Sequence, residues 1–220
     1  MKNIKNLNRF GFRCAGDVND ENIRILIRKN RKFFHMKYLK YTMAFLGIFF
    51  FGAVLSLRAY SINGPSMSPT VWWGERVIAN HLSYLLEDPA AGDMIIYFDT
   101  HKNSVACKRI VAIPGDQVWM QNNVLFVNGM EQKHRLLERW TEDMRAGKGV
   151  LGERVATEEI GGITHYLTYT RKKSEKHSFD PITLQADEYF ILGDHRDNSM
   201  DSRFIGPIAK DQIKGKVIWW

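Results

Sequence analysis

The chain has 220 residues, of which 45% are hydrophobic and 25% are charged, and its formal net charge is +7. That length allows a buried core, and the composition is typical of a folded protein rather than a disordered one. Residues 1–40 contain 11 Lys and Arg with 3 Asp and Glu, whereas residues 41–220 contain 20 and 21. This distribution argues against a nucleic-acid-binding protein, because the folded part has no excess of basic residues.

The first predicted element is a stretch of 17 residues without a charged side chain, residues 41–57. A helix needs about 20 residues to cross a bilayer, and Lys40 and Arg58 can extend this stretch by reaching the interface with their charged ends. We predict a single transmembrane anchor; a buried core helix and a cleavable signal sequence are the alternatives. The positive-inside rule then makes residues 1–40 a basic cytoplasmic tail and places residues 58–220 outside.

The outer part of the chain is predicted to fold mostly as β-strands, because short apolar or alternating runs are separated by turn residues. Asn122-Asn123 and Asn128-Gly129 predict hairpin turns. A modest insertion at about 131–185 is charged at first, and residues 136–145 within it suit a helix. Strands are expected at 76–79, 94–98, 105–113, 118–120, 124–127, 163–170, 189–192 and 217–220. The prediction is a mainly β domain.

A serine and a lysine in this domain offer nucleophilic catalysis without histidine. Ser66 lies in GPSMSPT at 64–70, a Gly/Pro-rich turn that can expose its hydroxyl and gather amides around an oxyanion. Lys108 lies in an apolar run, where burial would lower the pKa of its amine and favour the neutral form of a general base. In the alternative interpretation, Ser66 is an ordinary turn residue and Lys108 faces solvent.

A third stretch, GDHRDNSMDSR at 193–203, is dense in Asp, Arg, Asn and Ser. It directly follows a predicted buried strand, so its polar groups are expected to satisfy one another. Gly92-Asp93 precedes another predicted strand in a similar way.

These segments together resemble the type I signal peptidases, a family of membrane-bound serine–lysine proteases. GPSMSPT is similar to the nucleophile box of the family, and Gly92-Asp93 to the next box. KRIVAIPGD at 108–116 is similar to its lysine box, and GDHRDNSMDSR to its last box. The order matches, and the resemblance covers about residues 40–130 and 180–217. It implies a signal-peptidase-like β domain preceded by a single N-terminal transmembrane helix.

The resemblance implies a role for each motif residue. Ser66 would be the nucleophile, with its amide in the oxyanion hole, and Lys108 would be the general base. Ser199 would hydrogen-bond and orient the lysine amine. Two ion pairs would support the site, Asp194 with Arg109 and Asp201 with Arg203.

The chain departs from the family pattern at two positions. Some relatives have a serine two residues before the nucleophile as a second oxyanion donor, and Gly64 stands there in this chain. His195 replaces the asparagine common in the last box, and we expect it to be tolerated on a surface turn.

Two tryptophans and a cysteine near the serine and lysine boxes have no role assigned by these motifs. Trp72 and Trp73 follow the nucleophile turn, and they are candidates for bilayer contact or for core packing. Cys107 precedes the lysine and is expected to be a small packed side chain. No histidine cluster has metal-ligand spacing, so no metal and no cofactor is implied.

The sequence therefore predicts a serine endopeptidase of the bacterial inner (plasma) membrane, with one span and a periplasmic or extracellular catalytic domain. It would remove signal peptides from exported preproteins after small residues of the Ala-X-Ala type, through an acyl-enzyme. The alternative within the family is a dedicated peptidase that matures a pilin-like or other single substrate of a conjugation or secretion apparatus. A self-cleaving serine–lysine repressor would need a DNA-binding domain in place of the apolar stretch. An inactive membrane-anchored binding protein would not need both reactive residues.

Overall fold

The computed structural model describes residues 36–48, 52, 56–85, 87–137, 154–170 and 177–220. Most of the predicted tail and residues 138–153 of the predicted insertion lie outside these ranges. The contacts divide the chain into two units, Met1–Gly52 and Ala53–Trp220, and each is described by itself.

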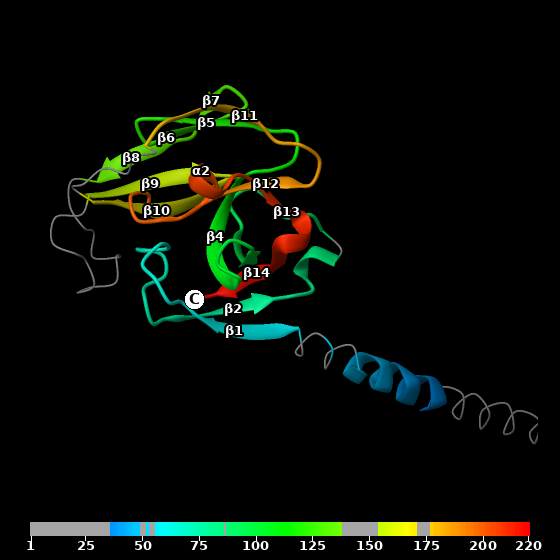
Figure 1. Ribbon diagram of the computed structural model, residues 1–220. Helices are drawn as coiled ribbons and strands as arrows, with labels where there is room; N and C mark the ends of the chain where they lie inside the picture. Colours follow the sequence, from blue (N-terminus) through cyan, green and yellow to red (C-terminus); the bar gives the residue numbers. More distant parts are fainter. Residues whose placement is uncertain (1–35, 49–51, 53–55, 86, 138–153, 171–176) are drawn as a thin grey trace, which may run out of the picture. The chain divides into compact units, whose positions relative to one another are not determined.

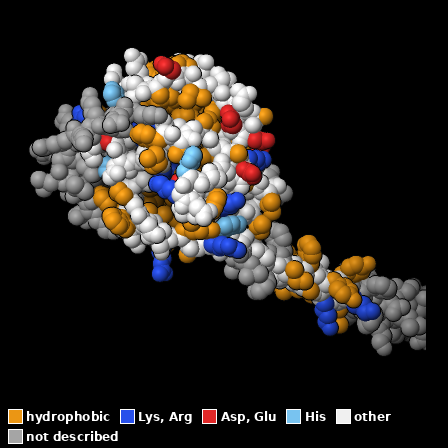
Figure 2. Space-filling model, viewed as in Figure 1, with side chains coloured by type: hydrophobic (Ala, Val, Ile, Leu, Met, Phe, Trp, Pro, Cys, Tyr) orange, Lys and Arg blue, Asp and Glu red, His pale blue; other side chains and the backbone are white. Residues whose placement is uncertain are grey.

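In the first unit, residues 36–48 form a helix. Its hydrophobic side chains are exposed, and Figure 2 shows them (orange) along the surface of this segment. The predicted anchor at 41–57 overlaps this helix at 41–48, and its residues 49–51 and 53–55 lie outside the described ranges. The helix already includes Lys37 and Lys40, because lysine is a good helix former, and Leu57 lies in a strand, where it pairs with Asn80. No helix within the described ranges is long and apolar enough to cross a membrane.

The second unit is built on a seven-stranded antiparallel sheet with the order β1-β2-β14-β3-β4-β12-β13 (Figure 1). Its strands are β1 (Leu57–Ser61), β2 (Arg76–Asn80), β3 (Met94–Asp99), β4 (Ser104–Ala112), β12 (Glu188–Leu192), β13 (Ile208–Ala209) and β14 (Ile213–Trp219). The predicted strand at 217–220 thus begins four residues earlier, and it lies inside the sheet between β2 and β3.

The described residues of this unit also form two smaller antiparallel sheets. One has the order β11-β5-β6-β7 and the other the order β10-β9-β8. Their strands are β5 (Gln117–Gln121), β6 (Val124–Val127), β7 (Met130–Glu131), β8 (His134–Leu137), β9 (Arg154–Ile160), β10 (Ile163–Tyr169) and β11 (Phe179–Thr183). The expected turns are confirmed: Asn122, Asn123, Asn128 and Gly129 have positive φ, as tight hairpin turns require.

The helical elements described in this unit are single turns: α2 (Ser202–Ile205) and the 3₁₀ turns η1 (Ser83–Leu85) and η2 (Lys210–Gln212). The helix suggested at 136–145 is wrong where it can be checked, because Leu136 and Leu137 end strand β8. The residues after them lie outside the described ranges. The domain is mainly β, as predicted.

The hydrophobic core fixes the position of the turn that follows β1. Met67 and Val71 from this turn are fully buried, and they pack with Val77 from β2 and with Met94 and Ile96 from β3. Alternate residues of β3 point to the opposite face, where they join a second cluster with β12. The turn is therefore held against the centre of the sheet.

Candidate active site

Ser66 lies in the nucleophile loop, which we define as residues 64–70 between β1 and β2. Its neighbour Met67 is buried, whereas Ser66 itself is half-buried. Within the loop, the amide of Ser68 donates to the carbonyl of Pro65 at 2.9 Å. The buried neighbour and this hydrogen bond hold the serine side chain at the surface of the domain.

Lys108 lies in β4 and is only 4% exposed. Its Nζ is 2.8 Å from the Oγ of Ser66 and donates to the carbonyl of Cys107 at 2.9 Å. Burial lowers the pKa of the amine below its usual range, although the carboxylates of Asp201 and Asp194 oppose this shift. The structure thus brings the two residues together, with the lysine in a setting that favours its neutral form.

A cleft of about 310 Å³ opens onto this pair of side chains. Its lining comes mainly from residues 60–64 and 104–108 and includes the side chains of Ile62, Ile96 and Val105. Lys102 also lines it, and its positive charge contributes to the lowered pKa of Lys108. The cleft can hold an extended peptide segment beside the serine hydroxyl.

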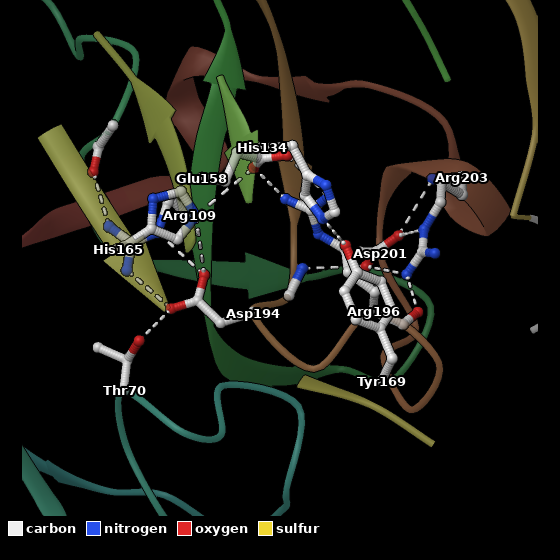
Figure 3. Close-up of polar contacts among 12 residues, drawn as sticks. Thr70, Arg109, His134, Glu158, His165, Tyr169, Asp194, Arg196, Asp201 and Arg203 are labelled. Carbon is white, nitrogen blue, oxygen red and sulfur yellow. Dashed lines mark hydrogen bonds and ion pairs between the residues drawn. The ribbon is translucent and has the colours of Figure 1, made fainter. Parts of the chain in front are cut away.

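Arg109, next to the lysine, forms a buried ion pair with Asp194 (Figure 3). Its Nε donates to Oδ1 at 2.9 Å and its Nη2 to Oδ2 at 2.7 Å, and its Nη1 donates to the carbonyl of Gly92 at 2.9 Å. Burial disfavours the charged form of Asp194, but the guanidinium outweighs this effect and holds the pKa of the carboxyl below its usual range. Gly92 has φ +94°, and a Cβ there would lie 2.7 Å from the carbonyl oxygen of Ile160. This position therefore requires glycine.

Asp201 and Arg203 form the second buried pair at the start of α2. The guanidinium donates to both carboxylate oxygens at 2.8 Å, and its Nη2 also donates to the carbonyl of Arg196 at 2.7 Å. Asp201 in turn accepts from the amide of Gly193 at 3.0 Å. This pair therefore fixes the start of the last-box loop, which we define as residues 193–203.

Ser199 lies in the last-box loop, close to the nucleophile loop. A Cβ at Gly193 would overlap with the Oγ of Ser199 and with the carbonyl oxygen of Ser66. The Oγ of Ser199 is buried and has no hydrogen-bond partner among the described residues. The structure places this hydroxyl near the site without a hydrogen bond to Lys108.

The expectation that His195 lies on a surface turn is wrong. The residue is 3% exposed, and burial lowers the pKa of its imidazole. Its amide donates to the carbonyl of Ser66 at 3.1 Å. The turn is packed against the nucleophile loop because its backbone supplies this hydrogen bond.

A buried charge network adjoins the Arg109–Asp194 pair (Figure 3), and no motif in the sequence indicates it. Arg196 is 1% exposed and donates to both carboxylate oxygens of Glu158 on β9. His165 on β10 lies 3.6 Å from Glu158 and 3.8 Å from Asp194. A charged residue in a strand usually predicts a solvent-facing position, so only the three-dimensional pairing identifies this network.

The tryptophans after the nucleophile loop differ in exposure. Trp73 is 71% exposed, and Trp72 is half-buried. On β14, Trp219 is also 60% exposed. Core packing therefore does not account for Trp73 or Trp219.

Cys107 is a buried free thiol, and burial raises its pKa to about 12. A thiol with such a pKa is almost entirely protonated near neutral pH and is a poor nucleophile. The residues described here include no group of three or more His, Cys, Asp and Glu positioned to hold a metal ion.

Comparisons with protein families, with known proteins and with solved structures all find signal peptidases. The family described as "Signal peptidase, peptidase S26" matches residues 35–220. Signal peptidase IB of Staphylococcus aureus is 32% identical over 177 residues, 80% of this chain and 82% of that protein. Signal peptidase I P of Bacillus subtilis subsp. natto is 31% identical over 163 residues, 71% of this chain and 72% of that protein. A crystal structure of a signal peptidase I from Enterococcus faecalis V583 has 20% identity and a TM-score of 0.35, and the match covers 60% of this chain and 97% of that one.

Proposed function

The chain belongs to the type I signal peptidases of peptidase family S26, which are serine endopeptidases, and on that premise we propose that Ser66 is its nucleophile and Lys108 its general base. The observation that carries the proposal is the distance of 2.8 Å between the Oγ of Ser66 and the Nζ of the buried lysine. Proton transfer needs such a contact, and burial keeps the amine able to accept the proton.

The reaction proceeds in two steps on this pair. Neutral Lys108 takes the hydroxyl proton as the Oγ of Ser66 forms a bond to the carbonyl carbon of the scissile peptide, and the amide of Ser66 donates to the resulting oxyanion. The lysine ammonium then gives its proton to the leaving amine, which departs as the new N-terminus of the mature protein. In the second step Lys108 accepts a proton from water, the hydroxide equivalent attacks the acyl-enzyme, and Ser66 recovers its proton.

The supporting residues have no part in proton transfer in this proposal. The pairs Asp194–Arg109 and Asp201–Arg203 hold the strands and loops around the site, because all four side chains are buried. Arg109, Asp201 and Arg203 also bond to backbone groups, and Asp194 also accepts from the hydroxyl of Thr70. Ser199 would orient the lysine amine: its buried hydroxyl has no hydrogen-bond partner among the described residues, and it lies next to Gly193, which also neighbours the carbonyl of Ser66.

The substrate is the signal-peptide region of an exported preprotein, cut after small residues of the Ala-X-Ala type. The cleft beside Ser66 is compact and partly apolar, which suits small side chains. The dedicated processing of one pilin-like precursor is the second candidate, and the two differ in whether a generic preprotein is cleaved.

We place the enzyme at the bacterial inner membrane with its N-terminus inside. The exposed apolar side chains of helix 36–48 and the basic residues 1–40 support a single anchor of this orientation. Trp73 is exposed next to the nucleophile loop and suits contact with lipid headgroups. An anchored protein stays in the membrane pellet after alkaline extraction, whereas release into the supernatant would contradict the anchor.

The test is cleavage of an Ala-X-Ala preprotein by the purified full-length chain in detergent. Ser66→Ala and Lys108→Ala are expected to lose activity by at least about a thousandfold. Ser83→Ala and Lys133→Ala, which alter a serine and a lysine far along the chain from the site, serve as matched controls and should remain active. Comparable turnover by either site variant would contradict the assignment. A well-folded wild type that cleaves only a pilin-like precursor would favour the dedicated peptidase.

A further inference from the structure

The small sheet β10-β9-β8 touches both loops of the active site through one residue of β10. Thr168 is fully buried. Its Oγ1 donates to the carbonyl of Ser68 at 2.8 Å, and its amide donates to the carbonyl of Asp194 at 3.0 Å. Its own carbonyl accepts from the amide of Arg196 at 3.0 Å. One residue thus joins the nucleophile loop to the last-box loop.

The hydrogen bond to Ser68 acts on the turn that presents the nucleophile. Ser68 is two residues beyond Ser66, and its amide closes the turn by donating to Pro65. Both backbone groups of Ser68 are therefore held, the amide within the loop and the carbonyl from β10. A shift of this carbonyl would rotate the turn and move the Oγ of Ser66 relative to the Nζ of Lys108.

The last-box loop restrains the same turn from its other side. The amide of His195 donates to the carbonyl of Ser66, and the hydroxyl of Thr70 donates to the carboxylate of Asp194. Because Thr168 bonds the backbone at Asp194 and Arg196, it fixes both loops in one arrangement.

Strand β10 is itself held firmly enough to serve as a support. The neighbours of Thr168, Leu167 and Tyr169, are buried in a cluster with Ala156 of β9. The Arg196 guanidinium reaches across to Glu158 on β9 and ties the last-box loop to the same sheet. Buried, hydrogen-bonded groups of this kind resist displacement.

We propose that Thr168 is a positioning residue for the peptidase reaction: its hydroxyl holds the nucleophile loop in the position in which the Oγ of Ser66 reaches the Nζ of Lys108. This inference rests on the proposed function of that pair. It also gives the predicted insertion a part in catalysis, because residues 163–169 would complete the support of the active site.

The experiment compares kcat and KM of three full-length variants on the preprotein substrate. Thr168→Val keeps the shape of the side chain and removes the hydroxyl, and it leaves the Ser68 carbonyl without this donor. We expect kcat to fall about tenfold or more with KM within twofold of wild type, because small misplacements of a nucleophile are costly. Thr168→Ser restores a hydroxyl and should return kcat to within about threefold of wild type. Thr164→Val, on an exposed position of the same strand, is the matched control.

A merely structural role gives a different result. If Thr168→Val lowers the melting temperature but keeps the wild-type kcat, or if Thr168→Ser is as impaired as Thr168→Val, the positioning role is refuted. If Thr168→Val does not fold, Thr168→Ala is measured against Thr168→Ser by the same criteria. Ser66→Ala runs alongside: activity in that variant would overturn the proposed function itself, whatever Thr168 does.

Discussion

Acid should destabilise this domain through one buried imidazole, that of His165. The side chain is 6% exposed, and burial lowers its pKa to about 4, although the carboxylates of Asp194 and Glu158 favour its charged form. Each of these carboxylates already has a guanidinium partner, Arg109 or Arg196. The imidazole therefore stays neutral in the folded protein at pH values at which it is protonated in the unfolded chain.

The size of the effect follows from the difference between the two pKa values. The ordinary value of 6.5 applies to the unfolded chain, so between pH 6.5 and about 4 this imidazole binds a proton in the unfolded state and none in the folded state. Stability is complete above pH 6.5 and falls as the pH drops towards 4, below which this group has no further effect. At about 1.4 kcal/mol per unit, the loss attributable to His165 is about 3 kcal/mol.

Denaturant unfolding of the full-length protein in detergent, followed by tryptophan fluorescence, measures this loss. The free energy of unfolding is compared at pH 7 and pH 4 for wild type and His165→Gln, so that the protonation of carboxylates common to both proteins cancels. The variant should lose about 3 kcal/mol less than wild type over this interval. His101→Gln, an exposed histidine beyond β3, should behave as wild type. An equal loss in wild type and His165→Gln would refute the reasoning.

Three further results are expected. Lys102→Gln removes a positive charge near Lys108 and should raise the pKa of that lysine, so the acid limb of the pH–rate profile should move to higher pH. Lys214→Gln, the exposed control, should leave the acid limb in place. A maleimide at pH 8 should neither label Cys107 in the folded enzyme nor inhibit it, because burial raises the pKa of the thiol to about 12; rapid inactivation by labelling would contradict this. A Cβ at Gly64 meets no atom within 4 Å, so Gly64→Ser has room for a second oxyanion donor and should raise kcat by about tenfold. An unchanged or lower kcat would contradict this.

The strands were predictable where the local pattern is strong. Alternation and Asn/Gly turns located β5, β6 and β10, because side-chain period and turn geometry depend on neighbouring residues alone. The pattern carries no information on pairing, so the place of β14 inside the sheet could not be derived. Leu57 shows the same limit of a local pattern: it belongs to the uncharged stretch in the sequence, but it lies in a strand, where it pairs with Asn80 of β2.

The site residues also divide into those that local motifs predicted and those whose contacts depend on residues distant in sequence. Serine and lysine boxes 42 residues apart predicted a Ser–Lys pair, and the folded chain brings Ser66 and Lys108 within 2.8 Å of each other. Glu158 and His165 escaped notice, because an ionisable side chain in a strand normally faces water and its burial depends on partners distant in sequence. The prediction for His195 was wrong because this residue packs through its backbone amide, which donates to the carbonyl of Ser66. Every residue except proline has such an amide, so the residue type gives no sign of this contact.

The position of β14 has a consequence for the enzyme's own biosynthesis. Within the large sheet, the β1–β2 hairpin that carries the nucleophile loop is joined to β3 and β4 through β14. That strand, Ile213–Trp219, is the last to leave the ribosome of all the strands described here. Until it arrives, the hairpin lacks its main-chain hydrogen bonds to the rest of this sheet, and core packing and loop contacts alone hold Ser66 beside Lys108. Completion of the large sheet therefore waits for a strand made after every residue of the site.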